Sequence, residues 1–284
     1  MMKNKKKQNY EMANPPQQVL PIKGFNFNVQ TKSFQKIKRQ IKPLDLLLFH
    51  GESIQSRAIL LAETITLGHK IPLFSHAALV VTKELLPDVP QLEDGKLYVW
   101  ECTAGDSQTC LDFKATDIEF PETGSVGNQI RDFEVVLQYC EHINETVAWC
   151  PLINNPWKKH QSQRKSICKK LCDFHKSYGN AGYDFNLVDL LGAVFHSPRS
   201  FRNAVDSAIA RLLKFVHCHH GNAYKVDKKN PLRKFFCSEL VACVYQLVGV
   251  LPATYDCRNY SPMSPLGLGT RMPALTKQIV YLTV

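Results

Sequence analysis

The sequence predicts an α+β fold in which a small, mostly antiparallel sheet packs on a half-buried helix. Three observations carry this prediction. Short apolar runs with strand-like alternation recur between residues 43 and 102, and an apolar stripe with helical spacing begins at residue 237. Between them, from about residue 140 to residue 232, the chain becomes helix-prone, which we interpret as a helical insertion packed against the sheet.

The composition is that of a folded chain. Of its 284 residues, 44% are hydrophobic and 10% are aromatic, which is sufficient for a sizeable core. No window reaches the run of about 18 apolar residues that spans a membrane, and residues 1–24 lack the apolar segment of a secretory signal. We therefore expect a soluble, cytoplasmic protein with no integral membrane segment, whose ten scattered cysteines are reduced.

The formal net charge of +10 is partly concentrated in a Lys-rich opening segment and in a second basic cluster over residues 157–170. Residues 1–35 show no sustained periodicity, so we interpret them as a basic, poorly ordered tail that precedes one domain over residues 36–284. Basic runs bind nucleic acid or anionic lipid in some proteins, but solvated surfaces are the commoner case. Weak binding of the tail to an anionic surface stays an open alternative.

Three short apolar runs lie between residues 43 and 102, and each of them predicts a buried strand. The first covers residues 43–49 and is bounded by proline and glycine. The second covers residues 74–81. Its period of two places His76, Ala78 and Val80 on the same face. The third covers residues 96–102 and ends on one face with Glu101.

The remaining elements follow from helix and strand signals along the chain. We expect a helix from Ser53 or Ser56 to Gly68, strands near 109–113, 130–137 and 278–282, and helices over 158–178, 187–195 and 201–216. The last clear helix runs over residues 235–248 and ends at a glycine.

Cys237 lies in the first turn of that last helix, which is where a cysteine becomes reactive. Unsatisfied backbone N–H groups and the positive end of the helix dipole stabilise a thiolate, and the same N–H groups can hold an oxyanion. A packed, inert cysteine is the alternative, and Cys243, deep in the same helix, illustrates it.

His76 and Glu101 are the candidates for a base and for the group that orients it. His76 begins a strand, and rigid strand ends position catalytic groups well. A carboxylate on an apolar strand is costly unless a partner pairs with it, so Glu101 needs an imidazole or, alternatively, a Lys or Arg side chain. A structural histidine with no catalytic role is the competing interpretation of His76.

The cluster His217-Cys218-His219-His220 lacks the paired spacings of a zinc module, and adjacent residues do not all point to one ion. Phosphate-binding glycine loops are absent from the sequence. We therefore expect no metal and no cofactor.

Three motifs carry a resemblance to a known family. They are Ser-His-Ala-Ala-Leu-Val-Val at 75–81, Trp-Glu-Cys-Thr at 100–103 and Phe-Cys-Ser-Glu-Leu-Val-Ala at 236–242. Together they resemble the NlpC-type papain-like superfamily, and most closely its circularly permuted branch, the YiiX-like cysteine hydrolases and their poxvirus relatives. Papain-type enzymes run Cys then His, whereas here His precedes Cys, as permutation requires. The branch has Gly-Asp near its start, and this chain departs from it with Leu44-Asp45.

The resemblance implies a permuted papain-like fold with Cys237 as nucleophile, His76 as base and Glu101 as the polar third member. Tyr183, in a segment that looks like the Gly-x-Tyr-Asp of the branch, is implied to line the site. Ser75 and Ser238, the neighbours of the base and the nucleophile in their motifs, are predicted to contact substrate with it.

The expected function is a cysteine hydrolase, amidase-like or peptidase-like, that acts on a peptide, amide or lipid-ester carbonyl through a thioacyl intermediate. An acyltransferase or lipid-ester hydrolase on the same site is one alternative, which the lecithin:retinol acyltransferase relatives imply. A non-catalytic module that binds nucleic acid or a membrane surface is the other. The poxvirus relatives leave a viral origin open, with a location in the host cytoplasm or the virion.

Overall fold

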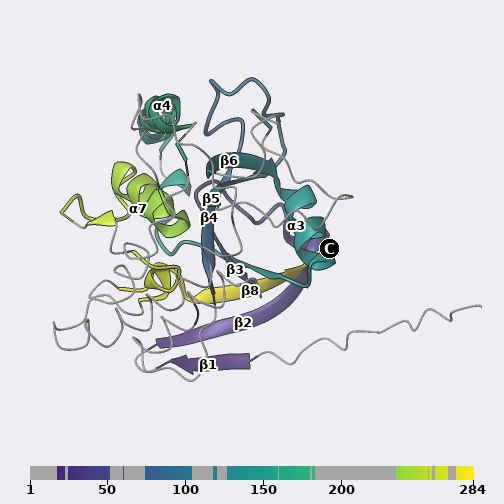
Figure 1. Ribbon diagram of the computed structural model, residues 1–284. Helices are drawn as coiled ribbons and strands as arrows, with labels where there is room; N and C mark the ends of the chain where they lie inside the picture. The colour runs from purple at the N-terminus through teal and green to yellow at the C-terminus, as the bar shows by residue number, and fades with distance from the viewer. Residues whose placement is uncertain are drawn as a thin grey trace, which may run out of the picture.

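The computed structural model describes residues 18–22, 25–51, 60, 74–103, 118–119, 127–158, 160–179, 181–182, 235–254, 256–257, 260–267 and 273–284. Over these residues the fold is α+β, with one mixed sheet and helices on both of its faces (Figure 1). None of the helices in these ranges is long and apolar enough to cross a membrane.

The sheet has eight strands in the order β1-β2-β8-β7-β3-β4-β5-β6. Neighbouring strands are antiparallel except for β2 and β8, which are parallel. The strands are β1 (Gln18–Ile22), β2 (Phe25–Ser33), β3 (Leu46–His50), β4 (His76–Val81), β5 (Tyr98–Thr103), β6 (Gly127–Asp132), β7 (Thr146–Cys150) and β8 (Gln278–Thr283). The helices are α1 (Phe34–Ile37), α3 (Phe133–His142), α4 (Gln161–Tyr178) and α7 (Cys237–Leu247), with short 3-10 turns η2 (Pro156–Lys158) and η4 (Ser264–Leu266).

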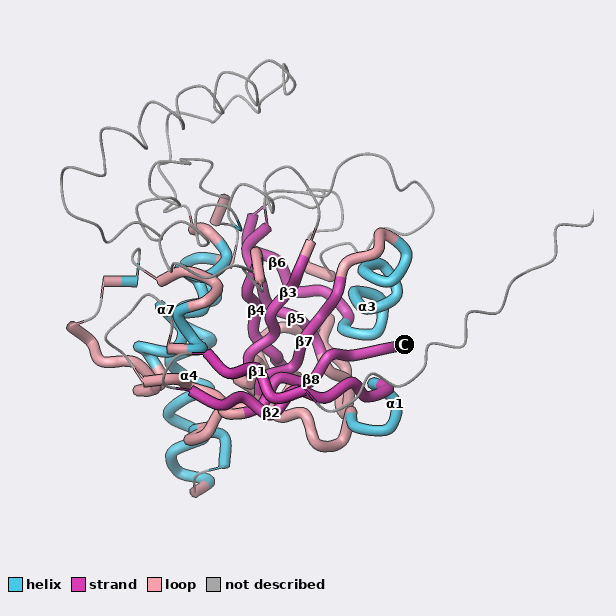
Figure 2. The backbone as a smooth tube through the Cα atoms, turned by 90° about the horizontal axis from the view of Figure 1, so that it is seen from below, coloured by secondary structure: helices cyan, strands magenta, loops and turns pink. Residues whose placement is uncertain are grey.

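The helices cover the two faces of the sheet separately. Figure 2 shows α7 and α4 on one side of it and α3 and α1 on the other. The pleat of β4 divides its residues between these two layers, because Leu79 and Val81 belong to the core beneath α7, whereas Ala78 and Val80 belong to the core beneath α3. The alternation predicted for this strand is therefore confirmed.

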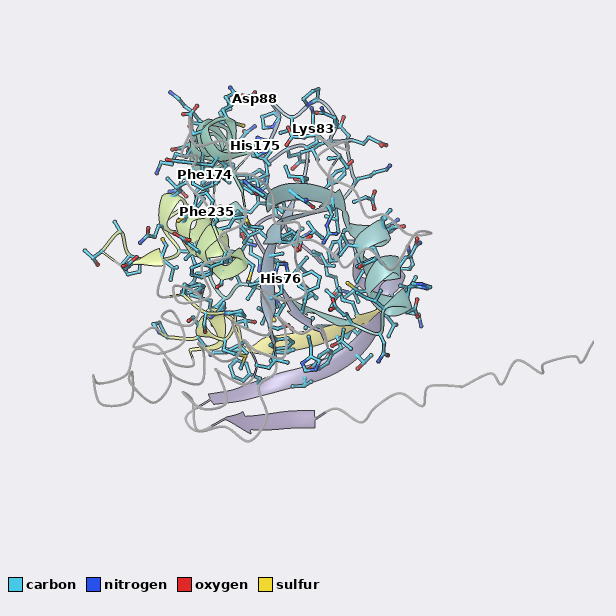
Figure 3. The ribbon with its side chains drawn as sticks, viewed as in Figure 1. His76, Lys83, Asp88, Phe174, His175 and Phe235 are labelled. Atoms are coloured by element: carbon cyan, nitrogen blue, oxygen red, sulfur yellow. The ribbon has the colours of Figure 1, made fainter. Side chains whose placement is uncertain are left out.

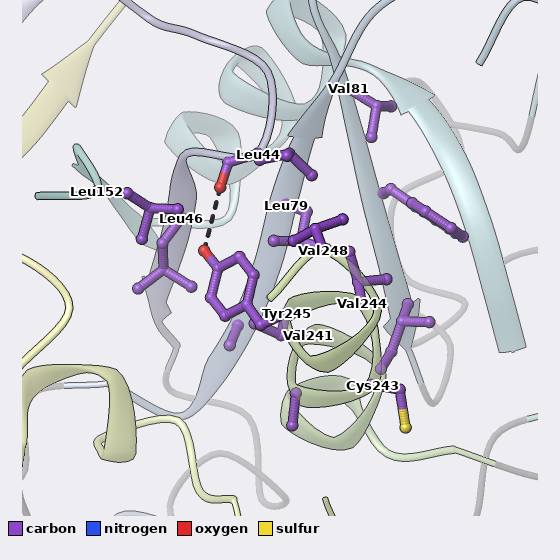
Figure 4. Packing of buried hydrophobic residues seen from close by; sticks show 14 of the residues in the cluster. Leu44, Leu46, Leu79, Val81, Leu152, Val241, Cys243, Val244, Tyr245 and Val248 are labelled. Atoms are coloured by element: carbon purple, nitrogen blue, oxygen red, sulfur yellow. Dashed lines mark hydrogen bonds between the residues drawn. The ribbon is translucent and has the colours of Figure 1, made fainter. Parts of the chain in front are cut away.

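Helix α7 is held on β4 and β5 by an apolar stripe, and one buried polar contact joins it to the residue Leu44 before β3 (Figure 4). Its residues Val241, Val244 and Val248 pack in the same core as Leu79. The hydroxyl of Tyr245 donates to the carbonyl oxygen of Leu44 at 3.1 Å. This packing fixes the start of α7 relative to β4, and it confirms the helix predicted over residues 235–248.

Several other elements agree with the sequence analysis within a few residues. β3, β5 and β8 correspond to the strands predicted over 43–49, 96–102 and 278–282. α4 corresponds to the helix predicted over 158–178. β3 lies in a short apolar run bounded by Pro43 and Gly51, and the buried residues of α4 follow helical spacing from Ile167 onward.

The prediction that residues 1–35 are a poorly ordered tail is wrong for its second half. Residues 18–22 form β1, the edge strand, and residues 25–33 form β2, which lies between β1 and β8 and pairs in parallel with β8. The segment from Phe25 to Val29 alternates apolar residues with asparagine, a strand pattern too short to stand out in a polar region. The sheet is consequently larger than predicted.

Two boundaries in the middle of the chain also need correction. The helical insertion does not begin at residue 140, because residues 146–150 form β7 inside the sheet, between β3 and β8. The strand predicted over 130–137 ends at Asp132, whose side chain accepts hydrogen bonds from the N–H groups of Glu134 and Val135 and so begins α3. β7 follows α3 after only three residues, without a proline or glycine to mark its start.

The strand predicted over 109–113 and the helices predicted over 187–195 and 201–216 lie outside the described residues. So does the helix predicted from Ser53 or Ser56, except for Leu60, which is helical and buried.

Asp45 fixes the start of β3 with four hydrogen bonds. Its carboxylate accepts from the N–H groups of Lys42 and Leu152 and from the side chains of Trp149 and Asn155, at 2.8 to 3.2 Å. The preceding residue, Leu44, has a φ of 70°, the left-handed region that glycine favours. The leucine that stands where the resembled branch has glycine therefore lies at a position whose backbone suits glycine.

Replacing Asp45 by alanine is expected to lower the free energy of unfolding by about 3 kcal/mol or more, because buried N–H donors lose their acceptor. Urea denaturation measures this cost. Asp88→Ala is the matched control, since Asp88 is exposed and pairs with Lys176 at 2.6 Å, and it should cost far less stability. A small and equal cost at both positions would contradict the prediction.

Candidate active site

The thiol of Cys237 lies at the first residue of α7 and is 1% exposed. The preceding residue, Phe236, occupies the N-cap position and has no side-chain oxygen, so no side-chain cap bond forms there. The backbone N–H groups of Ser238, in the helix, and of Ala77, on β4, donate to the Cys237 sulfur. A polar cap at residue 236 would have competed for these first-turn donors.

His76 lies at the first residue of β4, beside α7 (Figure 3). The register of β3 and β4 sets Phe49 opposite His76, and their rings pack edge to face with centroids 5.1 Å apart. The ladder between β4 and β5 ends at the pair Leu79 and Trp100, so His76 and Glu101 both lie beyond its last pair. The end of this ladder is where the base and the carboxylate meet.

The Glu101 carboxylate divides its two oxygens between two partners. Oε2 is 2.5 Å from Nε2 of His76. Oε1 accepts from Nε of Arg131 at 2.6 Å and also contacts the Nη2 of that guanidinium. Because Nε2 of His76 lies against Glu101, Nδ1 is the ring nitrogen left for the hydrogen bond with Cys237.

The structure therefore brings together the three residues that the sequence proposed as nucleophile, base and orienting group. It also adds Arg131, which the sequence analysis missed. The two partners considered for Glu101, an imidazole and a basic side chain, are both present. The available signal was the alternation of β6, which sets Gln129 and Arg131 on one face of a buried strand beside β5.

The Cys237 and His76 pair favours an ionised form. Burial raises the pKa of the Cys237 thiol, but the charge and hydrogen bond of His76, with the N–H groups of Ala77 and Ser238, bring the pKa below its usual value. Burial lowers the pKa of His76, but Cys237 and Glu101 together raise it to about 10. A thiolate beside an imidazolium is the form of a reactive cysteine.

Glu101 stays ionised for a comparable reason. Burial of this carboxylate, which is 1% exposed, raises its pKa, but the Arg131 charge and the contact with His76 lower the pKa to about 2. A carboxylate that is charged at neutral pH accepts the Nε2–H of His76 and orients the ring.

Of the three residues predicted to bind substrate, two have hydrogen-bond partners within the fold and the third is not described. The Ser75 hydroxyl is buried and bridges backbone groups, donating to the carbonyl of Phe49 at 3.4 Å and accepting from the N–H of Gly51 at 3.3 Å. The Ser238 hydroxyl is buried and donates to the carbonyl of Tyr260 at 2.5 Å. Both hydroxyls have structural partners, so this geometry does not support their contact with substrate. Tyr183 lies outside the described residues.

A surface groove of about 630 Å³ lies between α4 and residues 84–88. Basic side chains of α4 line it, including Arg164, whose guanidinium lies 5.3 Å from the centroid of the Trp157 ring. None of the triad residues lines the groove. Cys168, at its wall, has a pKa that burial raises, which disfavours the thiolate there.

Within the described ranges, no group of three or more His, Cys, Asp and Glu side chains could hold a metal ion. The predicted absence of a metal site at residues 217–220 concerns a segment outside those ranges. A comparison of the chain with protein-family models finds no match, and neither does a comparison with curated proteins.

Proposed function

We propose that this protein is a cysteine hydrolase of the permuted papain-like kind, acting on amide or ester carbonyls. The observation that carries the proposal is the contact in series of sulfur, imidazole and carboxylate from α7, β4 and β5, three segments far apart in the chain. The order of His76, Glu101 and Cys237 along the chain, and a helix that begins with the cysteine and packs on the histidine strand, support the permuted arrangement.

In the proposed reaction the Cys237 thiolate attacks the carbonyl carbon and forms a carbon–sulfur bond. The carbonyl oxygen becomes an oxyanion beside the N–H groups at the start of α7. The His76 imidazolium gives its proton to the leaving amine or alkoxide, which departs as the thioester forms. His76 then takes a proton from water, whose oxygen attacks the thioester and releases the acid and the thiolate. Glu101 holds the ring throughout.

A mild thiol-directed electrophile at neutral pH is expected to modify Cys237 before Cys168. Exposure alone would favour Cys168, which is the less buried of the two thiols. The expected order follows instead from the pKa values, because the pKa of Cys237 is lowered and that of Cys168 is raised. Peptide mass spectrometry after brief exposure measures the order. Faster labelling of Cys168, in protein that keeps its native fold, would contradict the proposed function.

The substrate class is tested by the acyl group that Cys237 retains. Incubation with fatty-acyl esters and, separately, with short peptides should leave a thioester on Cys237 from one of the two sets, found by the same mass measurement. Cys237→Ala, which has no sulfur at this position, should carry no acyl group from either. Acylation that persists in this variant would contradict the assignment of the nucleophile.

A further inference from the structure

Arg131 is a buried cation that reaches the triad from β6, the strand that follows β5 at the end of the sheet. We propose that Arg131 is a positioning residue of the site, which holds the Glu101 carboxylate by one oxygen and keeps the Cys237 sulfur ionised. The inference rests on the proposed function, because it assigns a role within the same site.

The geometry restricts how Glu101 can turn. Nε and Nη2 of Arg131 both contact Oε1, and that leaves Oε2 for the His76 ring. The sheet register gives Arg131 this reach, since it pairs with Val99, two residues before Glu101 and on the same face of β5. A guanidinium is planar and rigid, so this contact defines the plane of the carboxylate and thereby the orientation of the imidazole.

The positive charge of Arg131 lowers the proton affinity of the acids around it. A positive charge buried beside acids lowers their affinity for protons, and the effect is strong where water is excluded. Removing the charge of Arg131 therefore raises the proton affinity of Glu101 and of Cys237, wherever other charges lie. Because the pKa of His76 is raised to about 10, the ring stays protonated while the thiol titrates, so the loss of the Arg131 charge acts on the thiol and lowers the thiolate population at neutral pH.

Other titratable groups lie on the elements around this chain of contacts. Besides His76, Glu101, Arg131 and Cys237, the strands β5 and β6 and helix α7 carry Tyr98, Cys102, Asp132, the buried Glu239, Cys243 and Tyr245, and β3 and α3 carry His50, Glu134, Tyr139, Cys140, Glu141 and His142. Glu134 is exposed and pairs with Lys38 at 3.2 Å, whereas the residues of α3 that pack on the sheet are apolar. The direct link from Arg131 to the triad therefore passes through Glu101.

A purely structural role predicts a different result. If Arg131 only stabilises the sheet, its replacement lowers stability and leaves the titration of Cys237 unchanged. The measurement that separates the two roles is the pH dependence of thiolate absorbance, taken as the difference between each protein and its Cys237→Ser counterpart. This signal needs no reagent to reach the buried sulfur.

In Arg131→Met the midpoint of thiolate formation is expected to rise by about one pH unit or more. Arg131→Lys keeps the charge and loses the planar fork, so its midpoint should stay closer to that of the wild type, with lower turnover from a less constrained carboxylate. Arg164→Met is the matched control, because it removes an arginine of the α4 groove that has no contact with the triad, and its midpoint should not move.

A second comparison keeps the test decisive if Arg131→Met does not fold. The double variant Glu101→Gln/Arg131→Met replaces a buried ion pair by neutral side chains of similar size, an exchange that proteins often tolerate. Its midpoint should lie above that of Glu101→Gln alone. Unchanged midpoints in both comparisons would overturn the role of Arg131 and leave the proposed function standing. A wild-type midpoint at the usual value of a thiol would overturn the proposed function itself.

Discussion

Cys237→Ala is expected to abolish turnover of an amide or ester substrate, with a loss in kcat on the order of 10⁴-fold or more, as the removal of a triad nucleophile causes. The physical reason is that the remaining groups can orient a water molecule but cannot form the thioester. Initial rates with the substrate class identified by acylation measure the loss. Stability should change little, by about 1 kcal/mol, because the variant loses one buried sulfur and also a buried charge.

Cys243→Ala is the matched control for this prediction. Cys243 lies in the same helix, is buried and packs in the same core as Val244, six residues beyond the nucleophile. Its replacement should cost a similar or larger amount of stability and leave turnover intact. Equal activity losses at the two positions would mean that α7 is merely sensitive to change, and that the reactivity assigned to Cys237 is wrong.

Glu101→Gln is expected to reduce both turnover and stability. Arg131 donates to Oε1, so the carbonyl of the new amide should face Arg131 and its NH₂ group should face Nε2 of His76. The neutral ring then carries its proton on Nδ1, toward Cys237, and cannot accept the proton of the thiol. Loss of the orienting carboxylate in a triad costs on the order of 10⁴-fold in kcat.

The same change leaves the buried Arg131 without a counter-charge at Glu101, which should lower the free energy of unfolding by about 3–5 kcal/mol near neutral pH. Thermal and urea denaturation measure this loss. Glu134→Gln breaks the exposed pair with Lys38 and is the control, with an expected cost below about 1 kcal/mol. If both changes cost equally little, the ion pair of Glu101 with Arg131 does not form.

The pH dependence gives the prediction a second signature. The pKa of Glu101 in the folded protein, about 2, is below its usual value of 4.5, so its stabilising contribution is complete above that usual value and is lost as the pH falls toward 2. The wild type should lose roughly 3 kcal/mol through this group over that range. Glu101→Gln has no such group to titrate, so its stability should fall less steeply between these two pH values.

Much of the local structure could be predicted because burial leaves a repeating pattern in the sequence. The alternation in β4 and the apolar stripe of α7 each reflect one buried face, and both elements were predicted with their bounds nearly correct. β7 could not be recognised in this way, because it begins three residues after α3 with no proline or glycine between them, whereas Pro43 and Gly51 bound the apolar run that contains β3. β2 lies in a polar region, and its place in the sheet depends on pairing with β8, about 250 residues later in the chain.

The sequence by itself determined the three candidate residues of the proposed site: a cysteine in the first turn of an apolar helix, a histidine at a strand start, and a glutamate on a strand face that needs a partner. Only the tertiary structure decided that these three side chains meet, that Arg131 holds the second oxygen of Glu101, and that the N–H of Ala77 reaches the sulfur. The reason is that periodicity records which face of an element is buried, whereas the contacts between elements depend on strand register and helix docking, which no local pattern encodes.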